Sequence, residues 1–172
     1  MPTLNPDASS GLNNVNFLQP TAFKLIIDRR NYQNLEFFAQ TVLHPSMSMN
    51  AAELPYSRLT SVAMPGDKLT FGELTANIIL DENMNAYLEM YNWMKRLVET
   101  PNTSELTRDG QPATFADITV SVLTSHNNTN RKIKYVDCIP TLLGDVSFEA
   151  TTGDTQYLVF PVQFRFSYFE IV

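Results

Sequence analysis

The 172-residue sequence is poor in the residues that carry most enzyme chemistry. A single cysteine, Cys138, excludes an intramolecular disulfide and a cysteine-rich zinc site, and its strand context predicts a packed thiol. The two histidines, His44 and His126, lie in turn-like segments without a Cys, Asp or Glu at metal-ligand spacing. Neither histidine belongs to a recognisable nucleophile motif, and the sequence has no glycine-rich phosphate loop. We therefore expect no catalytic, cofactor-binding or metal-binding residue.

Long apolar runs and clusters of positive charge are also missing. No stretch approaches the roughly 20 apolar residues that cross a bilayer, and the first residues lack the basic and apolar regions of a secretion signal. The chain is therefore expected to be soluble, to act without a membrane and to be made in a reducing cytoplasm. The net charge of −6 argues against a nucleic-acid grip, because phosphate contacts require clustered Lys and Arg. The one basic cluster, Arg131, Lys132 and Lys134, is interpreted as a solvated strand end.

The composition is that of one globular domain with a short arm. A hydrophobic fraction of 44% over 172 residues is enough to bury a core without a disulfide or a metal. Residues 1–18 are rich in Asn, Ser and Pro, show no periodicity, and are predicted to form a flexible N-terminal arm. Residues 19–172 are predicted to form a single β domain.

Alternation of apolar and polar residues predicts strands through most of this domain. The expected strands cover residues 23–28, 35–42, 68–80, 116–124, 132–139, 146–150 and 157–169. The last strand is expected to turn six residues of one parity toward the core: Leu158, Phe160, Val162, Phe164, Phe166 and Tyr168. Pro140 is expected to interrupt its strand, and a change of parity near Gly72 and Glu73 predicts a bulge or kink. Residues 46–68 predict an extended hairpin that projects from the body.

One helix is predicted, at about residues 82–98. Its apolar residues recur at helical spacing and define the expected core-facing stripe: Met84, Tyr87, Leu88, Tyr91, Met94 and Leu97. Trp93 lies beside this stripe and is expected to pack at its edge. Asp81 or Asn83 can cap the helix N-terminus. The adjacent carboxylates of Asp81 and Glu82 could also form a glycosidase acid pair, but a cap and a partner of the helix dipole explain them better.

The order of elements is strands, one helix, then strands. Because no β-α-β repeat occurs, a parallel nucleotide-binding sheet is disfavoured. The predicted fold class is mainly β: an antiparallel β-sandwich or barrel with one flanking helix and one extended hairpin.

Four motifs, taken in their order along the chain, resemble the tail tube family of contractile-tailed bacteriophages. That family includes the tube-like baseplate proteins that start the tube. The motifs are the arm-to-strand segment NFLQPTAFKLII, the turn PGDKLTF, the strand-to-helix segment LTANIILDENMNAYLEMYNWM, and the strand IKYVDCIPT followed by FPVQFRFSYFEI. The resemblance covers residues 17–172. It implies a tail-tube-like β-sandwich or barrel whose copies form six-membered rings through their sheet edges.

The resemblance also implies a structural role in a virion tail. Hexameric rings would stack into a tail tube or form its baseplate-proximal first ring, with sheath and baseplate proteins as partners and assembly in the host bacterial cytoplasm. DNA would pass through the lumen without specific binding, and the net negative charge suits such a channel. The projecting hairpin offers edges for pairing between subunits, so the candidate interface residues lie on it: Met47, Met49, Tyr56, Arg58, Leu59 and Val62. Tyr91→Asp is expected to break folding or ring assembly and to leave no catalytic defect.

Two other functions stay open at the level of sequence. A β-sandwich module that recognises a protein or a glycan would need an exposed aromatic platform, for which Tyr32, Tyr56 and Trp93 are the candidates. An enzyme would need a cleft that concentrates carboxylates or histidines, and the sequence shows no such concentration. We expect that the protein is not an enzyme.

Overall fold

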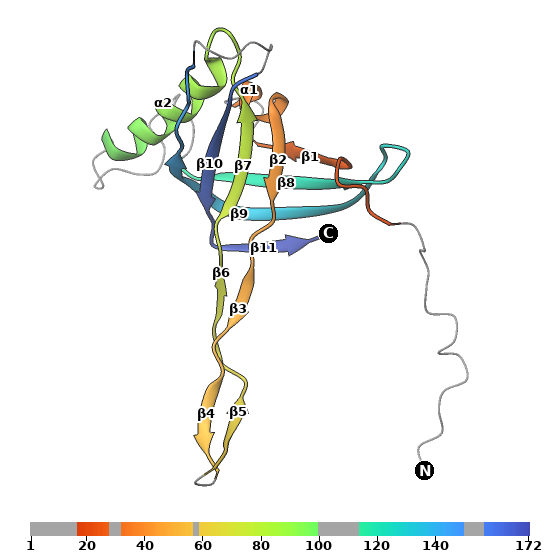
Figure 1. Cartoon of the computed structure of the whole chain (residues 1–172), viewed down its shortest axis with the longest axis vertical. Coiled ribbons are helices and arrows are strands. Elements are labelled where there is room, and N and C mark those ends of the chain that lie inside the picture. The colour runs from red at the N-terminus through yellow and green to blue at the C-terminus, as the bar shows by residue number, and fades with distance from the viewer. Residues whose placement is uncertain (1–16, 28–31, 57–58, 100–113, 150–156) are drawn as a thin grey trace.

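The computed structural model describes residues 17–27, 32–56, 59–99, 114–149 and 157–172. Figure 1 shows a body of crossed strands and helices from which one long hairpin projects. The predicted arm lies outside the described residues except for Phe17 and Leu18, which are both exposed. The predicted antiparallel, mainly β fold is confirmed.

Two antiparallel sheets share one long strand, β9 (Thr129–Leu143). The first sheet has the order β1 (Phe23–Ile26), β8 (Ala116–Leu123), β9 and β11 (Tyr168–Ile171). The second sheet has the order β9, β10 (Val159–Arg165), β7 (Leu74–Ile79) and β2 (Ala39–Leu43). In Figure 1 the strands of the two sheets cross at a large angle, as in orthogonal sheet packing. The strand path of the described residues runs from β1 to β2 without closing into a barrel.

Strand β9 bends where it passes from one sheet to the other. Asp137 has a φ of 55°, in the left-handed region that residues other than glycine rarely occupy. Its backbone amide donates a hydrogen bond to the carboxylate of Asp117 at 3.3 Å, which supports the bend. The predicted interruption at Pro140 is wrong, because Pro140 is buried within β9 opposite Phe164. A shift in register beside this pair accommodates a residue that has no amide hydrogen.

The C-terminal segment forms two strands and not the single predicted one, because it follows the bend of β9. β10 buries three of the expected core residues completely: Phe160, Val162 and Phe164. β11 then pairs with β9 in the other sheet, so the parity changes: Tyr168 is exposed, and Phe169 packs against the core in its place. The strand expected at 146–150 is also wrong, since residues 146–149 are irregular.

The predicted helix is confirmed as α2 (Asn85–Glu99), but its buried side differs from the expected one. The residues at the centre of that side are fully buried: Ala86, Met90 and Trp93. Leu88 and Tyr91 are almost half exposed, so their predicted core position is wrong. Two overlapping stripes have helical spacing in this segment, and the one that buries Trp93 removes the larger side chain from water. The carboxylate of Asp81 accepts a hydrogen bond from the amide of Ala86 at 3.2 Å, which confirms the predicted cap.

A second helix, α1 (Gln33–Phe37), occupies the start of the strand predicted at 35–42, and β2 begins only at Ala39. Its conformation depends on α2, because the Glu89 carboxylate accepts hydrogen bonds from the backbone amides of Asn34 and Leu35, both at 3.2 Å. Such first-turn amides have no partner within their own helix. The cap comes from more than 50 residues away, so the local pattern could not predict this helix.

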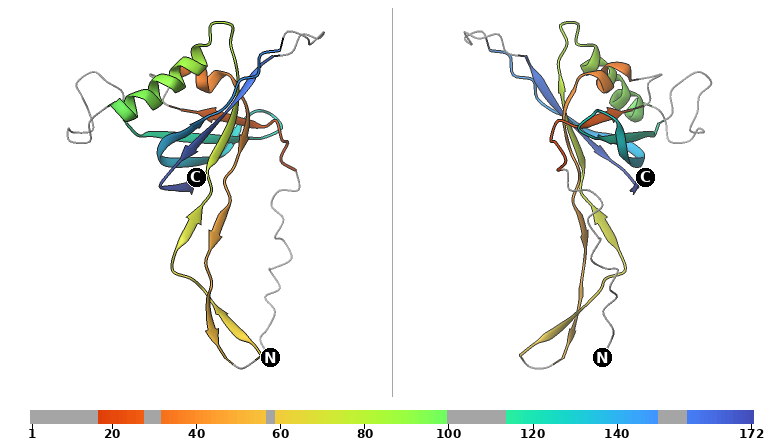
Figure 2. Two further views of the ribbon diagram at one scale, coloured as in Figure 1. Left: turned by 60° about the vertical axis from the view of Figure 1, so that its left-hand side comes forward. Right: turned by 90° about the vertical axis from the view of Figure 1, so that its right-hand side faces the viewer.

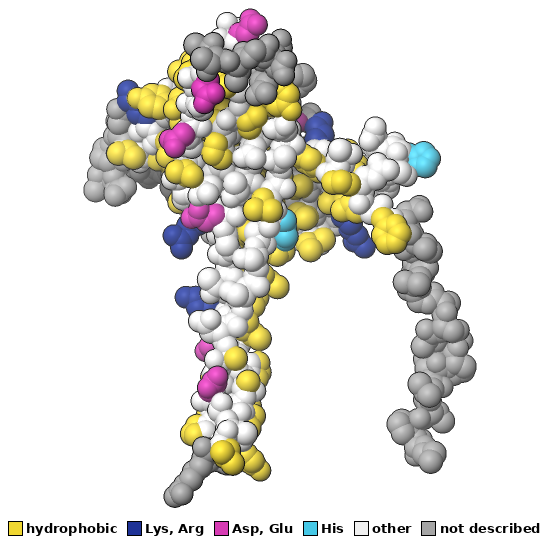
Figure 3. Space-filling model, in the orientation of Figure 1, with side chains coloured by type: hydrophobic (Ala, Val, Ile, Leu, Met, Phe, Trp, Pro, Cys, Tyr) yellow, Lys and Arg dark blue, Asp and Glu magenta, His cyan; other side chains and the backbone are white. Residues whose placement is uncertain are grey.

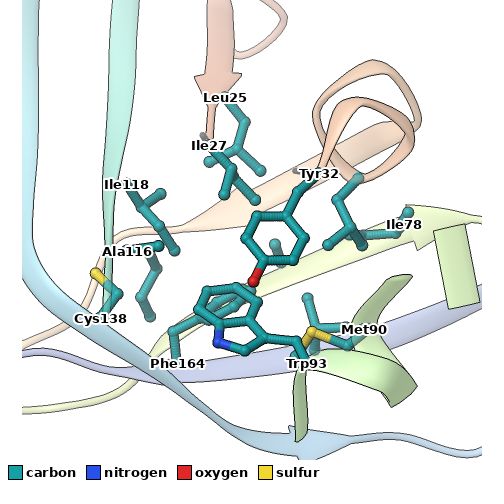
Figure 4. Packing of buried hydrophobic residues seen from close by; sticks show 14 of the residues in the cluster. Leu25, Ile27, Tyr32, Ile78, Met90, Trp93, Ala116, Ile118, Cys138 and Phe164 are labelled. Carbon is teal, nitrogen blue, oxygen red and sulfur yellow. The ribbon is translucent and has the colours of Figure 1, made fainter. Parts of the chain in front are cut away.

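The core lies between the two sheets and against α2, as Figure 4 shows. Trp93 stacks on Tyr32 with ring centroids 4.4 Å apart and donates its indole N–H to the carbonyl oxygen of Thr114 at 3.2 Å. Arg96 donates a hydrogen bond to the Tyr32 hydroxyl at 2.9 Å. Apolar residues from both sheets surround this stacked pair: Leu25, Ile27, Ile78, Ile118 and Phe164.

Candidate assembly interface

The projecting hairpin continues β2 and β7 beyond the body. Its root ladder pairs β3 (Met47–Met49) with β6 (Leu69–Phe71), and its tip ladder pairs β4 (Ala52–Pro55) with β5 (Ser61–Met64). β7 begins after a break at Gly72 and Glu73, where the change of parity predicted a kink. Figure 2 shows in both views that the hairpin extends well away from the body. The extended hairpin predicted at 46–68 is therefore confirmed, and its ladder reaches Phe71.

Each of the two ladders of the hairpin has one apolar face. Residues directly opposite each other in an antiparallel ladder share a face. Six apolar residues occupy such positions, and we call them the apolar stripe: Met47 and Met49 with Leu69 in the root ladder, and Leu54, Val62 and Met64 in the tip ladder. The alternate positions are mostly polar, and there the Ser61 hydroxyl donates to the Glu53 carboxylate at 3.2 Å. Figure 3 shows hydrophobic side chains along one edge of the hairpin and charged ones on the opposite edge.

The apolar stripe is about half exposed in the single chain. Its relative exposures range from 44% for Val62 to 57% for Met47. Soluble monomers rarely expose a contiguous apolar patch of this kind, and such patches mark interaction surfaces. Complete burial of a Val, Leu or Met side chain contributes about 1.5–3 kcal/mol. Covering the half that is still exposed therefore contributes about 1 kcal/mol for each residue of the stripe.

The structure places the predicted interface residues in two groups. Met47, Met49 and Val62 lie on the apolar stripe, whereas Tyr56 and Leu59 lie near the hairpin tip with exposures of 80% and 94%. Arg58 lies outside the described residues. Their contact with another subunit stays a prediction.

Sequence reasoning missed half of the apolar stripe. Leu54, Met64 and Leu69 were not among the candidate interface residues. Leu54 stands opposite the candidate Val62, and Leu69 stands opposite the candidate Met49. The missing information was the register of the two ladders, which decides which residues stand opposite each other. The signal that could have found them is the repeated apolar spacing of two residues within 52–54, 62–64 and 69–71.

The body adds unpaired strand edges to this surface. Within the described residues, β1 and β2 end the strand path and β11 pairs only with β9, so each of the three leaves one edge without a strand partner. The unpaired backbone amide and carbonyl groups of an edge strand can accept a strand from another chain. The hairpin and the body edges together give the chain several surfaces at which another chain can bind.

The carboxylate, thiol and histidine residues that were considered as catalytic candidates lie at a helix cap, in the core or in a loop. Asp81 caps α2, and Glu82 is exposed beside it. Cys138 is fully buried, and this burial raises the pKa of its thiol to about 12. His126 is exposed in the loop before β9, within hydrogen-bond distance of the Ser125 hydroxyl. In the part of the chain that the structure describes, no three His, Cys, Asp or Glu side chains gather as metal ligands. No helix in that part is long and apolar enough to span a membrane.

The basic cluster of β9 is solvated, as predicted. Arg131 and Lys132 are exposed, and the ammonium of Lys134 lies 2.8 Å from the carboxylate of Asp117. Water screens an exposed pair of this kind, so it adds little to stability. The cluster therefore offers no concentrated positive surface.

Comparison with known proteins gives matches at the level of structure. No protein-family model matches the sequence, and no curated protein matches it significantly. A chain from the tube terminating cap of the anti-feeding prophage has a TM-score of 0.67 and 16% identity, and the match covers 96% of this chain and 97% of that one. A chain from the sheath-tube complex of an extracellular contractile injection system (PVC), in its extended state, has a TM-score of 0.66 with the same identity and coverage. A chain from the anti-feeding prophage baseplate has a TM-score of 0.59 and 10% identity, with coverage of 87% and 90%.

These similarities define the class of fold. The chain has the fold found in tube, cap and baseplate assemblies of contractile injection systems, over nearly its whole length. It is a tail-tube-like β domain, and the resemblance drawn from the four sequence motifs is confirmed in fold.

Proposed function

We propose that this protein is a structural subunit of the tube of a contractile, phage-type injection machine, in the shaft or in one of its terminal rings. Six copies form a ring, and the ring binds neighbouring rings together with sheath and baseplate proteins. The role is mechanical, without enzymatic activity and without a cofactor.

The observation that carries the proposal is the half-exposed apolar stripe on a projecting hairpin. A hairpin that leaves the body cannot cover its own apolar face, so another chain must do so. The agreement in fold with chains of tube-forming machines supports a second copy as that chain.

The magnitudes favour a ring and not a simple contact through the hairpin. Covering the six residues of the stripe contributes roughly 6 kcal/mol, whereas association costs about 4–15 kcal/mol in lost translational and rotational freedom. The hairpin therefore needs a second surface, and the free edges of β1, β2 and β11 supply candidates. In a closed head-to-tail ring every copy has two such interfaces, so closure adds stability that an open dimer lacks.

A ring of this kind would enclose a channel. The net charge of −6 per chain would repel a polyanion and let DNA pass without binding. We place the protein in the tail of a virion or of a related particle, after assembly in the cytoplasm of a bacterial host.

The alternative role as a glycan- or protein-recognition module loses most of its support. Of the three aromatic residues considered for an exposed platform, Tyr32 and Trp93 are core residues that stack on each other. Only Tyr56 is exposed, and a single ring does not make a platform.

Native mass spectrometry of the purified full-length protein over a range of concentrations tests the proposal. We expect a species that contains six 19.5 kDa chains and whose fraction of the total protein rises with concentration. A protein that stays monomeric throughout, and that proteomics does not find in purified particles, would overturn it.

A further inference from the structure

Five aromatic side chains pack where the hairpin leaves the body: His44, Phe71, Tyr135, Phe166 and Phe169. His44 follows β2 and Phe71 ends β6, so these two belong to the two strands of the hairpin root. The other three belong to β9 and to the β10–β11 segment of the body. We call this group the aromatic latch. It links the hairpin to the body through side chains at the point where the backbone ladder is interrupted.

The contacts of the latch cross from hairpin to body on both strands. The His44 ring meets Phe169 edge-on, with centroids 5.1 Å apart and planes at 79°. The Phe71 ring lies 5.4 Å from Phe169 and 5.7 Å from Phe166. Tyr135 packs behind them, 5.1 Å from Phe166. Aromatic pairs in these geometries contribute about 0.5–1.5 kcal/mol beyond their buried area, so the latch can fix the angle at which the hairpin leaves the body.

One polar contact lies within this group. The Tyr135 hydroxyl and the His44 Nδ1 atom are 2.6 Å apart. Burial raises the pKa of Tyr135, so its phenol keeps its proton and donates to Nδ1. Nδ1 accepts this bond only in a neutral imidazole, whose proton is then on Nε2. In a protonated His44, Nδ1 carries a hydrogen and can only donate to the Tyr135 oxygen, so the hydroxyl must turn its own hydrogen away. Because Tyr135 is fully buried, that hydrogen then loses the acceptor that it now has, which weakens the closed contact.

The surroundings of His44 favour its neutral form. His44 is exposed on one side, but its ring packs against Tyr135 and Phe169, and this partial desolvation lowers its pKa from the ordinary value of 6.5. Tyr135 is the titratable group in contact with it; the charged neighbours on β9 and β11, Lys134 and Glu170, alternate with Tyr135 and Phe169 and extend from the other face. When the hairpin root is released from the body, His44 regains its ordinary pKa and binds a proton more readily than in the packed state. The packed state therefore loses stability relative to the released state as the pH falls below about 6.5.

We propose that His44 and Tyr135 make the aromatic latch a pH-sensitive device, which holds the hairpin root against β11 when His44 is neutral and releases it when His44 is protonated. The contacts of the device lie within one chain, so they do not depend on ring assembly.

Distance measurement between two spin labels tests this directly. Cysteines introduced as Ala63→Cys on the hairpin and Ser125→Cys on the body are at exposed positions, whereas the native Cys138 is fully buried and stays unlabelled. We expect a narrow distance distribution at pH 7.5 and a distribution at least twice as wide at pH 5.0. Tyr135→Phe keeps the ring and removes the hydroxyl, so it should give the wide distribution at both pH values.

The matched control is His126→Gln, which removes the other histidine and should respond to pH as the parent chain does. Circular dichroism at pH 5.0 checks that the body stays folded. A distribution that is equally narrow at both pH values would overturn the proposal. An unchanged pH response in Tyr135→Phe would also overturn it, because the hydroxyl would then play no part.

Discussion

Trp93 and Tyr91 lie two residues apart on α2, but replacing Trp93 should destabilise the fold far more than replacing Tyr91. Trp93 is 1% exposed, stacks on Tyr32 at 4.4 Å and donates a hydrogen bond to Thr114 at 3.2 Å. Trp93→Ala removes the ring and the hydrogen bond and leaves a cavity between two sheets. Truncation of a buried Trp in this way costs about 3–5 kcal/mol, which is a large part of the roughly 5–15 kcal/mol that stabilises a domain.

Tyr91 is the control, because it lies on the same helix and is 47% exposed. Tyr91→Ala should change the free energy of unfolding by about 0.5 kcal/mol or less. Urea unfolding followed by circular dichroism measures both variants. For Trp93→Ala the thermal midpoint should also fall by roughly 10 °C, given about 2–4 °C per kcal/mol for a chain of this size. If Tyr91→Ala costs more than Trp93→Ala, the buried side of α2 is assigned wrongly. Because Tyr91 is 47% exposed, we no longer expect Tyr91→Asp to break folding, and its effect on ring assembly stays a prediction.

Three further predictions concern the hairpin, the cap of α1 and the buried thiol. Leu54→Ser should raise the dissociation constant of each intersubunit contact roughly fivefold, because about 1 kcal/mol of apolar burial is lost. Sedimentation velocity measures this change, and Ala63→Ser on the opposite face is the control that should not alter it. Glu89→Ala should lower the free energy of unfolding in urea by about 2 kcal/mol, because the amides of α1 lose their acceptor; Glu82→Ala, which removes an exposed carboxylate, is the comparison. Cys138 should resist alkylation at pH 8 in the folded protein, since burial raises its thiol pKa to about 12, and should react within minutes in urea; fast labelling of the folded chain would contradict its burial.

The fold was largely predictable where a local pattern decides the structure. Strict alternation identified β7, β8 and β10, and the acidic residue before α2 identified its cap at Asp81. The change of parity near Gly72 and Glu73 predicted the break that separates β6 from β7. In these segments, side-chain period, turn chemistry and burial agree with one another.

The segments that were predicted wrongly have something else in common: the structure of each depends on a contact with a distant part of the chain. α1 forms where Glu89 caps its amides, and Pro140 lies inside a strand because a register shift opposite Phe164 accommodates it. The choice between the two apolar stripes of α2 depends on the ring of Tyr32, more than 60 residues away. Tertiary contacts of this kind override local propensity.

The sequence predicted which segment forms the candidate interface, but it did not predict which side of that segment is apolar. The Met-rich and Pro-interrupted sequence indicated a projecting hairpin, but the identity of its apolar stripe depends on the register of two short ladders. The aromatic latch was not predictable, because its members come from four segments between His44 and Phe169 that meet only in the folded chain.

Negative-stain electron microscopy of the purified full-length protein tests the central claim most directly. If the hairpin and the free strand edges close a ring, we expect round particles with a central opening and six-fold class averages. These particles should become rarer in Leu54→Ser at the same concentration. Single compact particles without rings, at every concentration and in both proteins, would contradict it.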